Sequence, residues 1–315
     1  MSGKRIITSK PGEIIDFETM FVENPAFESG TPKKVGRVER VDYTSDVYED
    51  GVTYPKYCNV YLPWCYDPAD KSRRYNVLYY QHGNTCDPEI FTGENQKKFD
   101  ILFDDGSIDP CIIVSTTYYF DVTKDVEERR RTGQVPAGDG AWPGTKGNFW
   151  REVVEKIIPA VETRYNTYLE DASPEGIKAT RDHRAFSGYS RGSVFTWNMF
   201  HNAFEYFRWW APMSCHTTAG KRIREAYTPE EVVEYLQQPI REHPDLPFYI
   251  FATNGGPKDV QAMTEQMKYI PKAEGFSYGR DPKQNNIYFS VSEFTHTDLL
   301  VPCYYYNSLK VLFKA

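Results

Sequence analysis

The chain has 315 residues, of which 40% are hydrophobic and 16% aromatic, and it carries a formal net charge of −7. This length suits one large α/β domain or two smaller ones, and the apolar content excludes a disordered chain. The acidic balance, without long blocks of Lys or Arg, argues against a protein that binds nucleic acid.

The N-terminus, residues 1–10 (MSGKRIITSK), has no apolar segment of the kind that a signal peptide requires, and no stretch of the sequence is apolar enough to span a membrane. We therefore expect a cytoplasmic protein as the sequence is given, or a secreted one if a signal peptide has been removed. The six cysteines form no C-x-x-C pair, so no metal held by cysteines and no disulfide framework are expected. We expect an N-terminal extension, 1–35, packed on a single domain, 36–315.

Short apolar runs recur along the chain and are typical of strands buried on both faces of a parallel sheet. They lie at residues 77–80, 111–114, 185–186, 248–251 and 287–289. Helical patterns separate several of these runs. The alternation predicts an α/β fold with a doubly wound, mostly parallel sheet and helices on both faces.

Between the second and third runs, apolar residues recur at every fourth position from Phe149 to Val161, which predicts an amphipathic helix. Asn148 is its expected N-cap, and Pro159 should bend it. The preceding segment, 121–147, breaks the alternation with a charged run and a stretch rich in Gly and Pro. A loop this long is usually functional or disordered, so the insertion is either a lid over the active site or a solvated loop.

The third apolar run leads directly into Gly188-Tyr189-Ser190-Arg191-Gly192, a G-x-S-x-G motif. In α/β-hydrolases this motif forms a sharp turn from a strand to a helix and exposes the serine hydroxyl above the sheet. The motif alone is common by chance. Here, however, the run before it and the helical pattern after it supply the expected context, which makes Ser190 the candidate nucleophile.

A serine becomes reactive when a base removes its proton and an acid orients that base. In α/β-hydrolases the chain order is serine, acid, histidine. Of the four histidines after Ser190, His296 follows the last apolar run, where the base is expected. Asp259 is the only carboxylate in the turn after the fourth run, and it is the expected acid.

An oxyanion hole requires two backbone N–H groups. One is expected from Arg191, the residue after the nucleophile, and the other from Asn84 in the loop after the first apolar run. His82, in the same loop, should hold it in place by hydrogen bonds.

Several segments in order carry a family resemblance. They are residues 59–63 (NVYLP), 82–83 (HG), 158–165 (IPAVETRY), 174–177 (PEGI) and 184–190 (RAFSGYS). In these segments, from about Gly36 to the C-terminus, the chain resembles carbohydrate esterase family 1, specifically the feruloyl esterases attached to bacterial xylanases.

The resemblance implies a single α/β-hydrolase domain that hydrolyses esters between hydroxycinnamic acids, such as ferulic acid, and the arabinose of xylan. Ser190 would form an acyl-enzyme, with His296 as base and then acid. The implied partners are feruloylated arabinoxylan oligosaccharides or small hydroxycinnamate esters, without nucleic acid or membrane, and no metal or cofactor is implied.

The sequence departs from the family pattern near the expected site. A Gly-x-x-Asp turn carries the acid in the family, and 256–259 fits that turn only if two residues are inserted before it. A gapless register instead places Gly256 at the acid position. Arg191 stands where an uncharged residue is common, so its charge either favours an acidic substrate such as a uronate or is paired away from the substrate.

Cys215 and His216 replace a Gly-Asp pair of the family and are expected in the pocket wall. Tyr118 and Trp142 are candidates to line a pocket for a phenolic acyl group, whereas a small closed pocket would favour acetate. The alternatives are therefore an acetyl xylan esterase and, from another class, a carbohydrate-binding pseudo-esterase with an incomplete triad.

Overall fold

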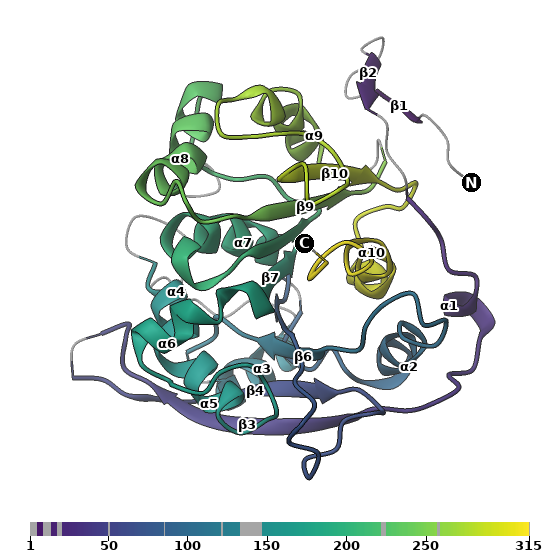
Figure 1. Ribbon diagram of the computed structural model, residues 1–315, viewed down its shortest axis with the longest axis vertical. Coiled ribbons are helices and arrows are strands. Elements are labelled where there is room, and N and C mark those ends of the chain that lie inside the picture. The colour runs from purple at the N-terminus through teal and green to yellow at the C-terminus, as the bar shows by residue number, and fades with distance from the viewer. Residues whose placement is uncertain are drawn as a thin grey trace.

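The computed structural model describes residues 5–8, 14–17, 21–49, 51–84, 86–120, 122–132, 147–221, 225–256 and 259–314. An eight-stranded sheet in the order β10-β9-β8-β7-β5-β6-β4-β3 forms the centre of the molecule (Figure 1). Its strands are β3 (Arg37–Ser45), β4 (Tyr54–Leu62), β5 (Val77–Gln81), β6 (Ile112–Thr116), β7 (Arg184–Tyr189), β8 (Trp209–Met213), β9 (Tyr249–Asn254) and β10 (Ile287–Val291).

The six strands β5 to β10 pair in parallel, and only β3 and β4 run antiparallel to their neighbours. The predicted mostly parallel sheet is therefore confirmed. The sequence analysis missed β8 as a strand, although it is fully buried. Its short run contains Pro212, a residue that argues against a central strand because it donates no ladder hydrogen bond.

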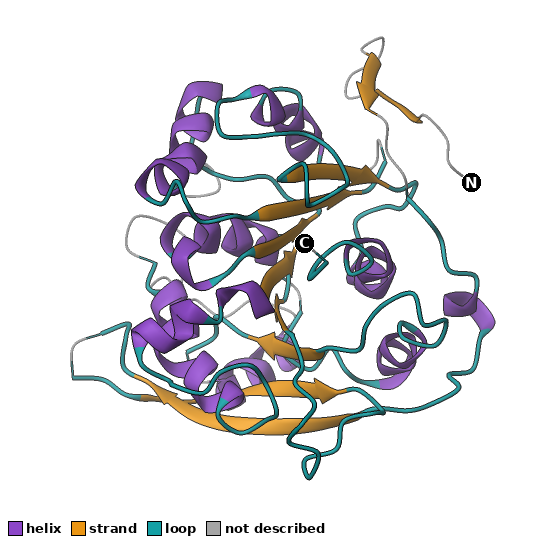
Figure 2. Cartoon of the chain, viewed as in Figure 1, coloured by secondary structure: helices purple, strands orange, loops and turns teal. Residues whose placement is uncertain are grey.

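Helices cover both faces of the sheet, as predicted (Figure 2). One face carries α3 (Val122–Thr132), α4 (Phe149–Glu152), α5 (Ile158–Glu162), α6 (Pro174–Ala179), α7 (Arg191–Asn202), α8 (Pro229–Glu242) and α9 (Gln261–Met267), and the other carries α1 (Ala26–Ser29), α2 (Gly93–Ile101) and α10 (Val301–Ser308) (Figure 1). Short 3₁₀ turns lie at Arg181–His183, Phe204–Tyr206, Ile270–Lys272 and Asp298–Leu300.

Side chains alternate between the two faces along each strand, which divides the core into two apolar clusters. On β5, Tyr79 packs in the cluster beneath α7, whereas Leu78 and Tyr80 pack in the cluster that includes Tyr304 and Tyr305 of α10. Most of the tyrosines and tryptophans that the structure describes are buried in this core.

The helix expected from Phe149 to Val161 is a composite. One π-helical segment, Val153–Ile157, joins α4 to α5. Pro159 has no N–H to donate to the carbonyl of Glu155, and the π segment lies where that bond would be. Asn148 occupies the N-cap position, as expected, but its side chain makes no capping bond, and its amide donates to the Val47 carbonyl oxygen at 2.7 Å.

The N-terminal region touches the domain through Phe21 and Val22. Phe21 packs edge-on against Tyr304 with ring centroids 6.1 Å apart, and the Val22 N–H donates to the Asn307 side chain at 2.7 Å. Further upstream, β1 (Arg5–Thr8) and β2 (Ile14–Phe17) form a separate antiparallel pair. No helix in the described part of the chain is both long and apolar enough to traverse a lipid bilayer.

Candidate active site

Ser190 sits on a sharp turn between β7 and α7, as the G-x-S-x-G motif predicts. Its backbone has φ 56° and ψ −117°, a conformation that a non-glycine residue rarely adopts. A Cβ on Gly188 would overlap the Gly192 carbonyl oxygen, and a Cβ on Gly192 would overlap the Gln81 carbonyl oxygen. Both motif glycines are therefore required by close backbone approach.

Gly192→Ala is expected to lower the free energy of unfolding by about 1–3 kcal/mol, because the added methyl group forces the turn away from β5. The loss should appear as a lower Tm in thermal unfolding, together with lower kcat as Ser190 moves. An unchanged Tm in this variant would show that the turn is looser than its geometry indicates.

The structure brings the three predicted triad residues together. His296 Nε2 lies 2.8 Å from Ser190 Oγ, and His296 Nδ1 lies 2.7 Å from Asp259 Oδ1. The Asp259 side chain is fully buried, whereas that of His296 is 39% exposed. This is the order of contacts that allows a histidine to take the serine proton while a carboxylate orients its ring.

Asp259 occupies a tight turn after β9, which decides the register left open by the sequence. The Asp259 N–H donates to the Gly256 carbonyl oxygen at 3.0 Å, and the Gly255 N–H donates to Asp259 Oδ2 at 2.6 Å. A Cβ on Gly255 would overlap the Phe294 carbonyl oxygen. Because Gly255 has no side chain, the Asp259 carboxylate fits beside it, and it is Asp259 that contacts His296.

The carboxylate of Asp259 has a third donor that the sequence analysis missed. Ser214, which follows β8 with a φ of 55°, donates its hydroxyl to Asp259 Oδ2 at 2.7 Å. Burial raises the pKa of Asp259, but the hydrogen bonds from its three donors more than offset that rise and leave the pKa below its usual value. The acid therefore stays ionised where His296 needs it.

Ser214→Ala is expected to lower kcat roughly tenfold with little change in KM, since a hydrogen bond to a charged group contributes about 1.5–3 kcal/mol. Steady-state kinetics measure this split.

Because the folded-state pKa of Asp259 is lowered, the ionised carboxylate stabilises the folded protein above the ordinary carboxyl pKa, and this stabilisation is lost as the pH falls through the folded-state pKa. The stability deficit of Ser214→Ala should therefore shrink in acid.

Ser193 offers a matched control, because its buried hydroxyl donates to the Cys215 carbonyl oxygen at 2.7 Å rather than to the triad. Ser193→Ala should lose stability and keep its kcat. A Ser214→Ala variant that raises KM at unchanged kcat would instead place Ser214 in substrate binding.

A cavity of about 280 Å³ opens beside the nucleophile. It is lined by Gly83, Asn84, Cys86, Tyr189, Ser190, His296 and Thr297. Asn84 thus lies at the site, as expected for one oxyanion-hole residue, and Arg191 is the first residue of α7. The positive end of the α7 dipole therefore lies next to the serine, where negative charge would develop.

Arg191 and Tyr118 contact one another. The Arg191 guanidinium lies 5.5 Å from the centroid of the Tyr118 ring, and its Nη1 is 3.4 Å from the Tyr118 hydroxyl. The Tyr118 side chain is buried and stacks on Phe195 with centroids 5.1 Å apart. Tyr118 is not among the residues that line the cavity beside Ser190, so its contact with substrate stays a prediction.

Cys215 and His216 follow Ser214 and also lie outside the lining of that cavity. Cys215 is buried, and its carbonyl oxygen accepts from the Trp197 indole N–H at 3.1 Å. His216 packs against Tyr227, and burial lowers the pKa of its imidazole. The insertion 121–147, expected as a lid or a solvated loop, is a helix over Val122–Thr132, which the sequence analysis did not predict. Trp142 and positions 121 and 133–146 lie outside the described residues.

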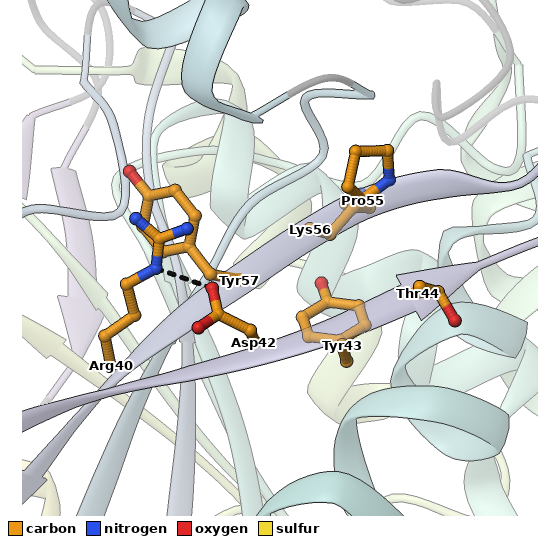
Figure 3. A pocket seen from close by; sticks show the side chains of 7 residues that line it. All are labelled: Arg40, Asp42, Tyr43, Thr44, Pro55, Lys56 and Tyr57. Atoms are coloured by element: carbon orange, nitrogen blue, oxygen red, sulfur yellow. Dashed lines mark hydrogen bonds and ion pairs between the residues drawn. The ribbon is translucent and has the colours of Figure 1, made fainter.

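A second hollow, of about 520 Å³, lies on the β3–β4 hairpin (Figure 3). Its lining residues are Arg40, Asp42, Tyr43, Thr44, Pro55, Lys56 and Tyr57. Arg40 bonds to Asp42 at 2.7 Å and stacks 3.8 Å above the Tyr57 ring. The hollow is larger than the cavity at Ser190, but no serine, cysteine or histidine lines it, so it does not compete as a hydrolytic site.

Comparison with known proteins finds relatives in both sequence and structure. No protein-family profile matches the chain. Endo-1,4-beta-xylanase Y of Acetivibrio thermocellus is 28% identical over 98% of the chain, which spans only 26% of that enzyme's length. A variant of the feruloyl esterase module of Clostridium thermocellum, solved with sinapinate, has a TM-score of 0.73 and 26% identity, covering 95% of this chain and 96% of that one.

A ferulic acid esterase of family 1 from the anaerobic fungus Anaeromyces mucronatus shares the fold, with a TM-score of 0.59 and 18% identity over 94% of this chain and 98% of that one. The chain therefore has the α/β-hydrolase fold, and in sequence and structure it resembles the carbohydrate esterase family 1 feruloyl esterases.

Proposed function

We propose that the protein is a serine carboxylic-ester hydrolase that releases ferulic or related hydroxycinnamic acids from arabinoxylan or its oligosaccharides. The observation that carries the proposal is the contact chain from Ser190 Oγ through His296 to the buried carboxylate of Asp259. A feruloyl esterase module of similar fold, solved with sinapinate, supports the acyl class.

In the proposed first step, Ser190 Oγ attacks the ester carbonyl carbon while His296 Nε2 takes the hydroxyl proton. Asp259 stabilises the resulting imidazolium. The backbone N–H groups of Arg191 and Asn84 would hold the negative oxygen of the tetrahedral intermediate. His296 then gives its proton to the departing sugar oxygen, which leaves a hydroxycinnamoyl ester on Ser190.

In the second step, water attacks the acyl-enzyme. His296 takes a proton from the water, the second tetrahedral intermediate collapses, and the proton returns to Ser190 Oγ as the free acid leaves. Every proton moves through one imidazole, and none of these steps requires a metal or cofactor.

The two alternatives differ in what they require of the site. A carbohydrate-binding pseudo-esterase would have an incomplete triad, whereas in this chain Asp259 is hydrogen-bonded to His296. An acetyl xylan esterase would use the same triad with a smaller acyl group, so the choice between esterases depends on the substrate.

Turnover of methyl ferulate, coumarate, caffeate and sinapate, set beside acetate release from acetylated xylan, tests the proposal. We expect kcat/KM for the preferred hydroxycinnamate ester to exceed that for the acetyl substrate at least tenfold, since the phenolic ring adds binding surface. Acetate release without ferulate release would replace the proposal with the acetyl xylan esterase.

A further inference from the structure

A buried ion pair lies beneath the β3–β4 hairpin. Lys56 Nζ is 2.7 Å from a carboxylate oxygen of Glu152, and both side chains are fully buried. Tyr43 and Tyr48 donate their hydroxyls to the same carboxylate. Because a buried ion pair often stabilises a fold no better than well-packed apolar residues, stability alone does not account for it.

The lysine also contacts the segment that follows β6. Lys56 Nζ donates to the Thr117 carbonyl oxygen at 3.3 Å, and Thr117 Oγ1 lies 2.7 Å from Nε2 of His82. The Tyr119 N–H donates to Thr117 Oγ1 at 3.2 Å. Lys56 therefore joins Glu152 to a short buried segment, 117–119, which in turn reaches the loop after β5.

That loop is the one that lines the catalytic cavity. His82 Nδ1 lies 2.8 Å from the Gly83 carbonyl oxygen, and a carbonyl only accepts, so Nδ1 carries a proton and Nε2 is left to accept from the Thr117 hydroxyl. At the other end of the loop, the Tyr119 hydroxyl donates to the Cys86 carbonyl oxygen at 2.6 Å. Segment 117–119 thus contacts His82 and Cys86, which lie on either side of Asn84 in the sequence.

The loop has little freedom to shift without affecting the serine. A Cβ on Gly83 would lie 3.3 Å from Ser190 Cβ, so the loop backbone packs directly on the nucleophile. Oxyanion donors contribute most when they are fixed in advance at the position where charge develops, and a displacement of about 1 Å can cost a factor of 10² in rate.

We propose that Lys56 and Glu152 are positioning residues for the oxyanion hole. They fix segment 117–119, and this segment holds His82 and Cys86, on either side of Asn84, which lines the cavity beside Ser190. Glu152 is the last residue of α4, and the π-helical segment, a feature frequent at functional sites, begins at the next residue. The inference rests on the proposed function, because it assigns residues to the same hydrolytic step.

Lys56→Met/Glu152→Gln tests the inference without leaving an unpaired buried charge. We expect kcat for methyl ferulate to fall about 10–100-fold while KM changes less than about twofold. Affinity for a styrylboronic acid, which forms a tetrahedral adduct with an active serine, should fall by a similar factor. Affinity for free ferulate, which forms no tetrahedral adduct with Ser190, should fall much less than the boronate affinity.

Arg184 and Glu162 supply the matched control. They form a second buried ion pair, 2.6 Å apart, at the start of β7, whereas Ser190 follows the end of that strand. Arg184→Met/Glu162→Gln should lower Tm and keep kcat within about threefold. If both double variants lower kcat and boronate affinity equally, the effect is general destabilisation and the inference is wrong.

Thr117→Val provides a second test that keeps the ion pair intact and removes only the hydroxyl that faces His82. It should also lower kcat and boronate affinity with KM unchanged, and it decides the question if the double variant at Lys56 does not fold. Parental kcat in a folded Thr117→Val or Lys56→Met/Glu152→Gln protein would overturn the inference. Lack of esterase activity in the parent protein would instead overturn the proposed function.

Discussion

Ser190→Ala is expected to lower kcat for a hydroxycinnamate ester by about 10⁶-fold, the loss seen when the nucleophile of a serine triad is removed. The reason is direct, because no acyl-enzyme forms without the Ser190 oxygen. The fold should survive, since alanine is smaller than serine and the Ser190 hydroxyl faces a cavity and not the core. Product release, followed by chromatography over long incubations, measures the residual rate.

Binding of ferulate to Ser190→Ala, by calorimetry, is the control that separates chemistry from recognition. We expect affinity close to that of the parent protein, because the cavity walls are unchanged. Residual hydrolysis above about one hundredth of the parent rate would assign the nucleophile to another residue.

Asp259→Asn is expected to lower kcat by about 10⁴-fold while the site keeps its shape. The physical reason is the tautomer of His296. The carboxylate accepts a hydrogen bond from Nδ1–H, which keeps the imidazole proton on Nδ1 and leaves Nε2 free to take the proton of Ser190, 2.8 Å away. An asparagine amide that donates to Nδ1 would place the imidazole proton on Nε2 and block it as a base.

Glu265 on α9 provides a comparison for this substitution, because its carboxylate pairs with Lys268, just after that helix, at 2.7 Å rather than with the triad. Glu265→Gln should leave kcat within about twofold, since a partly exposed ion pair contributes little. Near-normal kcat in Asp259→Asn would show that another carboxylate orients His296.

The sequence was sufficient to predict the fold class and the three triad positions because each depends on local order along the chain. The apolar runs predict strands, the glycines around Ser190 predict a tight turn, and His296 follows the last run. Asp259 was less secure, since a two-residue difference in a turn changes which residue reaches the histidine. The Gly255 N–H decides it, and that bond is visible only in the folded turn.

Other features depend on contacts between distant segments and could not be read from local pattern. Ser214 reaches Asp259 across 45 positions, and Lys56 reaches Glu152 across 96. Pro212 made the run at β8 look unlike a central strand. The π-helical segment before Pro159 has no simple sequence signature. The positive φ of Ser214 points to its unusual position, but a backbone angle is known only from the folded structure.

Covalent labelling tests the proposal that Ser190 is the activated nucleophile of a hydroxycinnamate esterase. An alkyl fluorophosphonate, which reacts with activated serines, should modify the protein once, on the peptide that contains Ser190. Ferulate should slow the labelling, and Asp259→Asn should slow it strongly. Labelling of a different residue, or no labelling of a protein that still hydrolyses methyl ferulate, would show that Ser190 is not the activated nucleophile.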